Sequence, residues 1–395
     1  MSATAKLPPD VAILVYDLRA SGVSRNALAI ADASLAADLS VELWVIRPQG
    51  HMQETAPEGV RVVQTPVGRK LPVGRTLDMV LSILPLARYL RRRPPKLLFS
   101  AGNHMHMAAG FGFTLAGCSG GTRFLGRASN AVLGTRIGGS GRASLRDRLL
   151  RRLDALQYVG MDRMVAVSIE LKNQLTELLR VDPARVVVIP NGVDAEVVRR
   201  WAPEPVAHPW LEAGEPPVLL GVGRLAPQKN FPLLIRAFAI ARRTRPMRLM
   251  IMGHGKREAR EALMRLAGEL EVGADVELLG YQRNPASWLS KVALFVLSSR
   301  REGASNVLLE ALATGCAVAA VACPTGVREV LDGLGGLSET ERPEDLAEAI
   351  LRSLADPPAR EALQRRAADY DRRASLAAFV DFFREELEKP PRDCS

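Results

Sequence analysis

Short apolar runs alternate with longer segments of helical periodicity along most of the chain. In the first half, this pattern predicts strands over 11–15, 41–46, 60–64, 97–100, 164–167 and 186–189, and helices over 26–39, 77–91 and 170–180. Strands that alternate with helices indicate βαβ units, which build parallel sheets with right-handed crossovers. Ligands of such sheets bind at the carboxyl ends of the strands.

A second series of the same kind fills the other half of the chain. Its strands are predicted over 218–222, 248–252, 276–279, 294–297 and 317–322. Between the two series, residues 201–217 hold five prolines and little periodicity, which is typical of a linker. We expect an α/β protein with two Rossmann-like domains, over 1–200 and 218–370, that face each other across a ligand-binding cleft. The glycine-rich region over 110–141 receives no assignment.

The length of 395 residues agrees with two domains, and no apolar run reaches the ~18–20 residues that a membrane-spanning helix needs. The first ten residues lack the apolar core of a signal peptide, so a cytoplasmic protein is expected. Cys118, Cys316, Cys323 and Cys394 show neither CxxC spacing nor a disulfide framework. We therefore expect reduced thiols and no cysteine-bound metal.

A net charge of +10 calls for an anionic partner: a polyphosphate ligand, a nucleic acid or an acidic membrane surface. Aromatic residues make up 5% of the chain and no RNA- or DNA-binding motif is evident, so no nucleic-acid partner is expected. A non-catalytic nucleic-acid-binding protein is the remote alternative. Basic residues gather over 88–96 and 142–152 of the first half.

Two segments of the second half carry residue types that suit a nucleotide diphosphate. The first begins with Gly221 and Gly223 at the end of a predicted strand and continues to Arg224 and Lys229. Glycines let the backbone approach a ligand, and two cations neutralise a diphosphate beside exposed amides. A tight strand-to-helix turn with two solvated cations explains the same residues.

The second segment places two carboxylates, Glu302 and Glu310, eight positions apart around the start of a predicted helix. Between them the loop and the helix start hold Gly303, Ala304, Ser305, Asn306 and Val307. Free N–H groups at a helix start favour a phosphate, and carboxylates suit vicinal hydroxyls. In the alternative interpretation, Glu310 is an ordinary exposed helix residue and Glu302 a loop residue.

Together the two segments resemble the retaining glycosyltransferases of family 4, which have the GT-B fold, and the resemblance covers about residues 10–385. Glu302 and Glu310 occupy the two positions of that family's E-x7-E element. The resemblance implies that Glu310 binds the donor ribose and that Glu302 binds the transferred sugar, with residues 303–307 in the donor site. It also implies that Arg224 and Lys229 bind the donor diphosphate.

The first half carries further similarities to the family. The segment Ser21-Gly22-Val23-Ser24-Arg25 is similar to its Gly-Gly-x-x-Arg loop, which implies that Gly22 faces the phosphates. His104 follows a predicted strand where the family has a histidine that contacts the donor sugar near the reacting carbon, and His106 is its rival. Residues expected on the acceptor side are Arg123, Arg127 and Asn130, and a solvated loop explains the same residues.

Other positions bear on donor identity. Tyr281 ends a strand at the place where the family's backbone pairs with the donor base. Ala304 stands where the family usually has a bulky residue, so the shape of the sugar pocket and the identity of the sugar stay open. The terminal segment over 371–395 is expected to form a helix that crosses back to the first domain.

The resemblance implies a hexosyltransferase that retains the anomeric configuration. No His/carboxylate cluster with metal-ligand spacing stands out in the sequence, so transfer without a metal or a cofactor is expected. A UDP-sugar is the favoured co-substrate, and a glycan or a lipid-linked molecule is the expected acceptor. A GT-B-fold sugar-nucleotide epimerase or a phosphorylase is the alternative. A panel of nucleotide sugars separates these activities.

The predicted helix over 77–91 ends in a cluster of cations, among them Arg91, Arg92 and Arg93. Such a segment favours an anionic leaflet, which would hold the protein peripherally at the inner face of the membrane. A helix that packs its apolar residues on the sheet explains the same pattern, because a cationic end complements the helix dipole.

Overall fold

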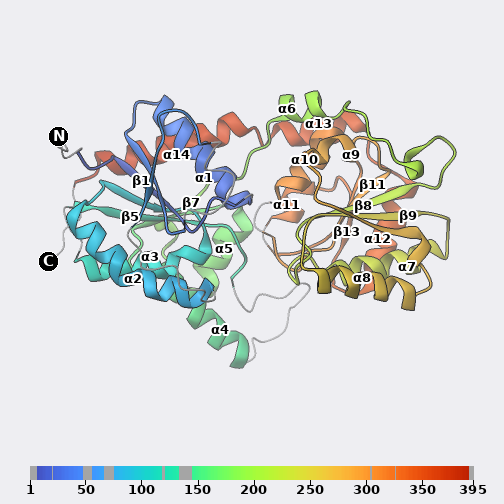
Figure 1. The fold of residues 1–395 in the computed structure, drawn as a ribbon, viewed down its shortest axis with the longest axis horizontal. Helices are drawn as coiled ribbons and strands as arrows, with labels where there is room; N and C mark the ends of the chain where they lie inside the picture. The colour runs from blue at the N-terminus through green and yellow to red at the C-terminus, as the bar shows by residue number, and fades with distance from the viewer. Residues whose placement is uncertain are drawn as a thin grey trace. The chain divides into compact units, whose positions relative to one another are not determined.

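The computed structural model describes residues 7–19, 21–47, 56–65, 75–117, 121–132, 145–302, 305–324 and 326–390. These residues form two compact α/β units (Figure 1). The first unit takes in the described residues before 133, together with 145–189 and 374–390. The second unit takes in the described residues over 190–373.

The first unit is built on a parallel sheet whose strand order is β3-β2-β1-β4-β5-β6-β7. Its strands are β1 (Val11–Val15), β2 (Val41–Val45), β3 (Arg61–Gln64), β4 (Leu97–Ser100), β5 (Arg123–Ala128), β6 (Arg163–Ala166) and β7 (Val186–Val188). The central strands β1 and β4 are fully buried, because helices cover both faces of the sheet. Continuous apolar runs such as Val11–Val15 are what a doubly covered parallel strand requires.

Six helices of eight or more residues belong to this unit among the described residues: α1 (Gly22–Ala36), α2 (Arg75–Arg92), α3 (Asn103–Ala116), α4 (Leu145–Ala155), α5 (Ile169–Leu178) and α14 (Arg372–Glu388). One face of the sheet packs against α1 and α14, and α2 and α3 lie on the other face (Figure 1). The ring of Phe383 in α14 lies 5.1 Å from the ring of Phe99 in β4. The last long helix of the chain therefore belongs to the core of the first unit.

The second unit has a six-stranded parallel sheet with the order β10-β9-β8-β11-β12-β13. Its strands are β8 (Val218–Val222), β9 (Arg248–Met252), β10 (Val276–Gly280), β11 (Leu294–Leu297), β12 (Val318–Val321) and β13 (Gly336–Ser338). Its helices are α6 (Ala195–Trp201), α7 (Phe231–Arg242), α8 (Arg257–Glu269), α9 (Pro285–Leu289), α10 (Asn306–Thr314), α11 (Val327–Leu331), α12 (Pro343–Ala355) and α13 (Arg360–Ala368).

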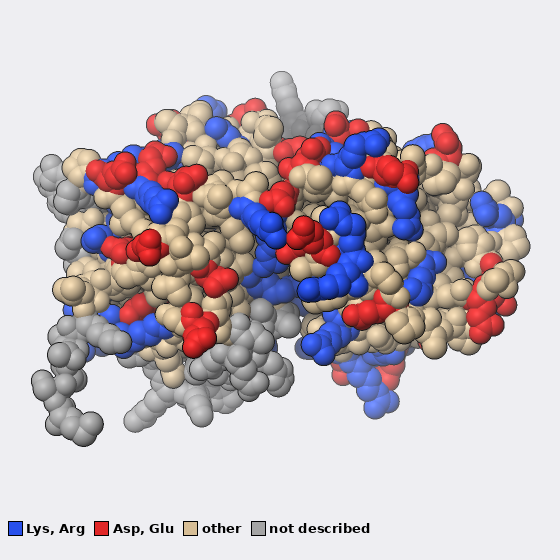
Figure 2. All heavy atoms as spheres, turned by 90° about the horizontal axis from the view of Figure 1, so that it is seen from above, with Lys and Arg blue, Asp and Glu red and all other residues tan. Residues whose placement is uncertain are grey.

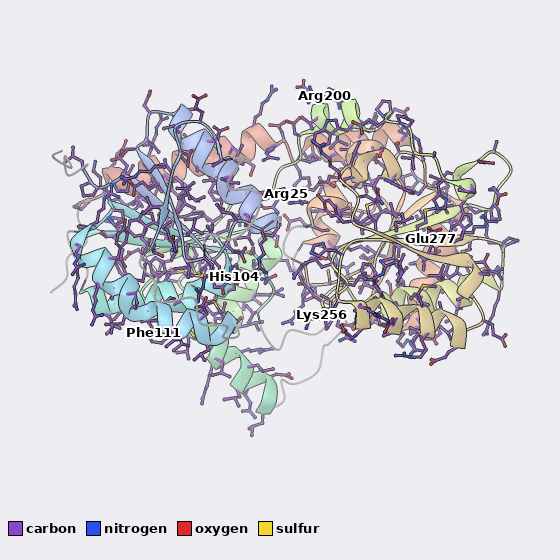
Figure 3. The ribbon with its side chains drawn as sticks, in the orientation of Figure 1. Arg25, His104, Phe111, Arg200, Lys256 and Glu277 are labelled. Atoms are coloured by element: carbon purple, nitrogen blue, oxygen red, sulfur yellow. The ribbon has the colours of Figure 1, made fainter. Side chains whose placement is uncertain are left out.

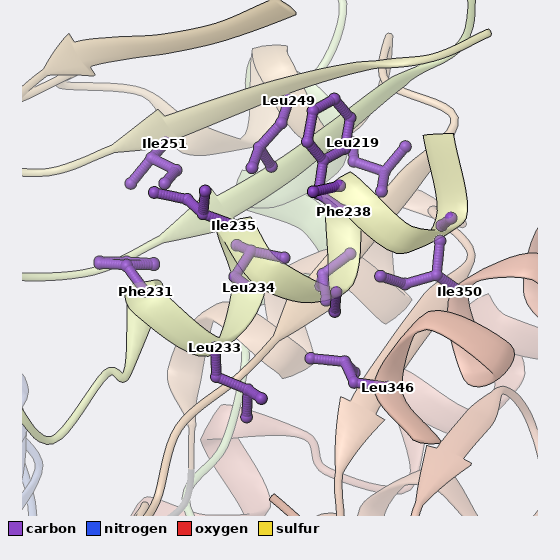
Figure 4. Packing of buried hydrophobic residues seen from close by; sticks show 14 of the residues in the cluster. Leu219, Phe231, Leu233, Leu234, Ile235, Phe238, Leu249, Ile251, Leu346 and Ile350 are labelled. Carbon is purple, nitrogen blue, oxygen red and sulfur yellow. The ribbon is translucent and has the colours of Figure 1, made fainter. Parts of the chain in front are cut away.

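Alternate residues of each central strand supply two separate cores. Leu219 of β8 packs with Phe238 of α7 and Ile350 of α12 on one face (Figure 4). Its neighbour Leu220 packs with Leu309 of α10 on the other face. Because strand side chains alternate between faces, a run of apolar residues covers both at once.

The division between the units falls between residues 189 and 190, which differs from the boundary at 200 that the sequence predicts. The segment over 201–217, predicted as a linker, packs within the second unit: Trp210 and Leu211 lie against the core that contains Leu220. Proline interrupts helical periodicity here, but these apolar side chains still find a buried surface. Among the described residues, no helix has the length and apolar character to cross a bilayer.

Two segments of the second unit run side by side where it adjoins the first unit in sequence. The amide of Val193 donates to the carbonyl of Tyr370 over 2.8 Å, and the amide of Arg372 donates back to the carbonyl of Val193 over 3.1 Å. At Gly192 an added Cβ would lie 2.3 Å from the Cα of Arg372, so only glycine permits this approach. The two crossings of the chain between the units are therefore paired through the backbone.

Candidate functional site

The second sheet has a topological switch point between β8 and β11. The chain leaves β8 for β9 on one side and leaves β11 for β12 on the other, so the connections diverge at the carboxyl ends of these adjacent strands. A crevice at such a point is the usual ligand site of an open parallel sheet. Both segments that the sequence singles out, 221–229 and 302–310, begin there.

Lys229 and Glu302 meet at this switch point. The Nζ of Lys229 lies 2.6 Å from Oε1 of Glu302, and the hydroxyl of Ser299 donates to the same oxygen. The side chains are largely buried, with 18% of Lys229 and 9% of Glu302 exposed. A partly buried ion pair holds both groups in one geometry, since removal of either would leave an uncompensated charge.

The backbone at the switch point is held tightly by two glycines. Gly223 has φ +153°, and an added Cβ there would lie 2.5 Å from Cε of Lys229. Gly253, after β9, has φ +147°, and its added Cβ would lie 1.8 Å from the carbonyl oxygen of Gly223. The glycine-rich turn thus brings Lys229 across the end of β8, as the sequence pattern requires.

The start of α10 offers groups for an anion. Ser305, the N-cap residue of α10, is 7% exposed. Its buried hydroxyl has no hydrogen-bond partner among the described residues. Asn306, the first residue of the helix, accepts a 2.8 Å hydrogen bond from Asn191. Free N–H groups and an unused buried hydroxyl at one helix start form a site that a phosphate oxygen would satisfy. Gly303 and Ala304 lie outside the described residues.

The other predicted donor residues lie at the same edge of the sheet. Arg224 follows β8 and is exposed, while Val307 and Glu310 are partly buried in the first turns of α10. Tyr281, 63% exposed, follows β10, and its ring lies 6.4 Å from that of His254, which follows β9. The edge therefore holds cations and a helix start at its centre and exposed rings to one side.

The first sheet repeats the arrangement, with its switch point between β1 and β4. Gly22 is the first residue of α1 after β1, and His104 is the second residue of α3 after β4. His104 is partly exposed, and its ring lies edge-on to Tyr16, with centroids 6.2 Å apart. Arg25 of α1 and His104 mark this end of the first unit (Figure 3).

His106 lies in the interior. Its Nε2 lies 3.0 Å from the carbonyl of Arg127 and its Nδ1 2.8 Å from Oγ of Ser100. A carbonyl only accepts, so Nε2 carries the proton and Nδ1 accepts from the serine hydroxyl. Burial lowers the pKa of His106 to about 3, because the charged imidazolium would lose its hydration.

Two of the residues expected on the acceptor side are placed differently from that expectation. Arg127 is 2% exposed, and burial lowers its pKa to about 10. Arg123 is tied to the C-terminal segment, where its guanidinium donates to the carbonyl of Pro390 over 2.7 Å. Both arginines therefore have structural contacts. Polar and apolar residues are mixed along β5, and this pattern does not reveal that helices cover both faces of the strand.

Sequence reasoning missed several residues of the site. Ser299 contacts Glu302, and the hydroxyl of Ser298 donates to the backbone of Lys229 over 2.9 Å. Asn230, at φ +51°, begins α7 directly after the lysine. The sequence signal that could have identified Ser298 and Ser299 is their position, two successive serines at the end of an apolar strand.

Among the described residues, no group of three or more His, Cys, Asp or Glu side chains is arranged to hold a metal ion. The chain has one Asp-x-Asp triplet, Asp369-Tyr370-Asp371. Its first carboxylate pairs with Arg366 over 2.8 Å, at the end of α13.

Comparison with known proteins gives matches over both units. Residues 20–197 match the model for Glycosyltransferase Family 4, and residues 216–356 match the model for Glycosyl transferases group 1. A Campylobacter jejuni relative, N-acetylgalactosamine-N,N'-diacetylbacillosaminyl-diphospho-undecaprenol 4-alpha-N-acetylgalactosaminyltransferase, is 31% identical over 54% of this chain and 57% of its own. The chain thus spans about half the length of this curated relative.

Solved structures share the fold over nearly the whole chain. Sucrose-phosphate synthase from Thermosynechococcus elongatus superimposes with a TM-score of 0.74 at 17% identity, and 96% of this chain and 99% of that chain are covered. The Anabaena protein HepE, in complex with UDP and glucose, gives a TM-score of 0.68 at 13% identity over 97% and 100% of the two chains.

Two Rossmann-like units, each with polar groups at the switch point of its sheet, define the GT-B class of folds. The family models that match both halves of the chain identify its family within that class. The protein belongs to glycosyltransferase family 4.

Proposed function

We propose that the protein transfers a hexosyl group from a nucleotide diphosphate sugar to an acceptor hydroxyl. The observation that carries this proposal is the contact between Lys229 and Glu302 beside the start of α10. A diphosphate needs cations and N–H donors, and a sugar needs a carboxylate that accepts from its hydroxyls. The second unit offers both at one switch point.

Roles follow for the individual groups. Lys229 and Arg224 bind the diphosphate together with the amides of residues 303–307, and Glu310 binds the ribose hydroxyls. Glu302 orients the transferred sugar, and His104 contacts it near the reacting carbon. Gly22 contributes a backbone amide to the phosphates. Tyr281 lies beside the base.

The donor we propose is a UDP-sugar, because HepE, which shares the fold, binds UDP and glucose. Thermal-shift titration tests this choice. A nucleotide at about 100 times its dissociation constant adds ~2.7 kcal/mol of stability, so UDP should raise the melting temperature clearly above the value with GDP. Equal shifts for the two nucleotides would overturn the choice of uridine.

The reaction we propose retains the anomeric configuration and needs no metal. Cations and the α10 dipole would stabilise the departing diphosphate in place of a divalent ion. Activity should persist in EDTA, and NMR of the product should show the donor's anomeric configuration. Strict dependence on Mg²⁺ or Mn²⁺, or an inverted product, would contradict this mechanism.

The acceptor we propose is a glycan or a lipid-linked sugar, met at an anionic membrane surface on the cytoplasmic side. The Campylobacter jejuni relative supports this, since its name specifies a diphospho-undecaprenol acceptor. Incubation with a panel of UDP- and GDP-sugars, with and without lipid-linked acceptors, tests the activity. Transfer that requires an acceptor supports the proposal. A new sugar nucleotide formed without an acceptor identifies an epimerase instead.

A further inference from the structure

The first half of helix α2 presents apolar residues away from the core, whereas Leu86 and Leu90 of its second half are buried. Leu77, Val80, Leu81 and Leu84 are each 47–51% exposed, at the spacing of a single helical face. The same two turns bury Asp78, 3% exposed, and Ser82, which is fully buried. A helix of an α/β domain normally does the opposite, so this outward face of α2 is not explained by packing on the sheet.

Asp78 is buried because it has partners. Arg47 donates to the carboxylate through Nε over 2.8 Å and through a second nitrogen, and the hydroxyl of Tyr16 donates over 2.8 Å. The Arg47 guanidinium holds the pKa of Asp78 below its usual range. These contacts fix the first half of α2, with Leu77, Leu81 and Leu84 outward.

Helix α4 repeats the inversion. Leu145, Leu149 and Leu153 are 78%, 58% and 51% exposed, whereas Asp147 and Asp154 are 7% and 3% exposed. The apolar face continues into the short helix that follows, where Leu156 is 41% exposed. Two helices of one unit therefore show carboxylates inside and leucines outside.

The two outward faces belong to the same side of the first sheet. Helix α2 packs directly on α3, and α4 leads into the turn 156–158, which also packs on α3. Both helices lie on the side of the sheet opposite to α1 and α14 (Figure 1). Both faces thus belong to the α3 side of the first unit.

Cations without exposed carboxylates accompany the leucines. Arg88 and Arg92 continue the outward face of α2, and Arg148 and Arg152 lie among the leucines of α4. No Asp or Glu is exposed on these faces among the side chains that the structure describes. The face that Figure 2 shows differs: on it Lys and Arg alternate with Asp and Glu.

We propose that the outward faces of α2 and α4 form a docking surface for an anionic lipid bilayer. Leucines enter the boundary between headgroups and acyl chains, and the arginines contact lipid phosphates. Charge complementarity selects this occupant: arginines among leucines match anionic headgroups above acyl chains, whereas in a second copy of the chain they would face each other.

The surface adjoins the proposed acceptor end of the first unit. Leu77 and Leu81 lie on the same turns of α2 as Asp78, which is bonded to Tyr16, and the ring of Tyr16 lies edge-on to His104. A bilayer on this surface would bring a lipid-linked acceptor next to that histidine. This last step rests on the proposed function, whereas bilayer binding itself does not.

Flotation with vesicles of phosphatidylcholine, with and without phosphatidylglycerol, at about 0.15 M salt tests the surface. Wild type should float with the anionic vesicles. Leu149→Ser with Leu153→Ser, Leu81→Ser with Leu84→Ser, and Arg148→Gln with Arg152→Gln should each lower the partition coefficient by roughly tenfold or more. The matched control is Met264→Ser with Arg265→Gln on the exposed face of α8, which should bind as wild type does.

Arg91 and Arg93 are left unchanged because both have structural contacts. Arg91 donates to the carbonyls of Leu115 and Ala116, and Arg93 donates to both carboxylate oxygens of Glu42 over 2.7 Å. Thermal unfolding of every variant should match wild type, since all substituted residues are exposed. A variant that binds less while melting at the wild-type temperature supports the surface.

Three outcomes would overturn the proposal. Wild type that stays below the anionic vesicles excludes a bilayer surface. A control that loses binding equally shows non-specific adsorption. A wild-type dimer in solution that the leucine variants dissociate, without flotation, assigns the face to a second copy of the chain. Glu310→Gln separates this proposal from the proposed function: it should lose transfer but float as wild type does, because Glu310 lies outside the docking surface.

Discussion

The side-chain amide of Asn191 donates to the side-chain carbonyl of Asn306 over 2.8 Å, so the segment after residue 189 is tied to the first residue of α10. Asn191 is 9% exposed, and the bond fixes the helix start from which a donor phosphate would accept. Asn191→Ala should lower the free energy of unfolding by about 1 kcal/mol and raise KM for the donor more than it lowers kcat.

A double-mutant cycle checks this coupling. Asn191→Ala and Asn306→Ala, measured singly and together by urea unfolding and steady-state kinetics, should be non-additive. Strict additivity in both measurements would show that the pair does not act as a unit.

Lys229→Ala and Glu310→Gln should each remove most transfer activity, because each loses a contact to donor charge or ribose worth about 2–4 kcal/mol in the transition state. Arg236→Ala is the matched control, since it removes an exposed cation from helix α7, which follows Lys229 in the chain. Initial rates at fixed donor, with circular dichroism as the check on folding, give the comparison. Near wild-type rates in Lys229→Ala would end the donor-site assignment.

His104→Ala and His106→Ala should fail in different ways. His104 is partly exposed, so its loss should reduce kcat and leave thermal unfolding unchanged. His106→Ala leaves Ser100 and the Arg127 carbonyl unpaired in the core and should cost about 2–4 kcal/mol of stability. Calorimetry and kinetics on both variants separate the roles; a stable, inactive His106→Ala would reverse them.

The buried His106 should make the protein sensitive to acid. Its pKa is lowered to about 3 in the folded state, while the unfolded chain takes up the proton near pH 6.5. The unfolded state binds more protons between these values, so stability falls as pH drops, with a slope from this group that approaches about 1.4 kcal/mol per pH unit. Urea unfolding between about pH 7 and pH 4 gives the free energy of unfolding as a function of pH, and its slope should be shallower for His106→Gln than for wild type. Equal slopes would contradict the prediction.

Strong local patterns predicted the strands well. The runs at 11–15, 97–100, 218–222, 248–252 and 294–297 have the bounds that the structure shows. Each is a short apolar run closed by a turn signal, and it lies in the middle of a sheet where both faces are buried. By contrast, neither α3 nor β5 was predicted: the glycine-rich region over 110–141 holds the second half of α3 and all of β5, and glycine is tolerated where helix and strand pack closely.

The sequence pattern could not decide between two histidines, and it could not predict which faces of α2 and α4 are exposed. His104 and His106 differ only in their angle around α3, which depends on where that helix begins. The apolar residues of α2 suggest one face that packs in the core, as Leu86 and Leu90 do, and only the partners of Asp78 show that the first half of the helix turns its apolar residues outward. Long-range polar contacts of this kind leave no periodic trace in the sequence.

Because α14 supplies Phe379, Phe382 and Phe383 to the core of the first unit, the part of the protein that the ribosome makes first is the last to be completed. Until those residues emerge, the apolar face that includes Phe99 lacks its cover. The second unit, continuous over 190–373, has no such dependence and is free to fold while synthesis continues. The nascent chain therefore carries an exposed hydrophobic surface while the whole second unit is made, one that a chaperone would be expected to occupy.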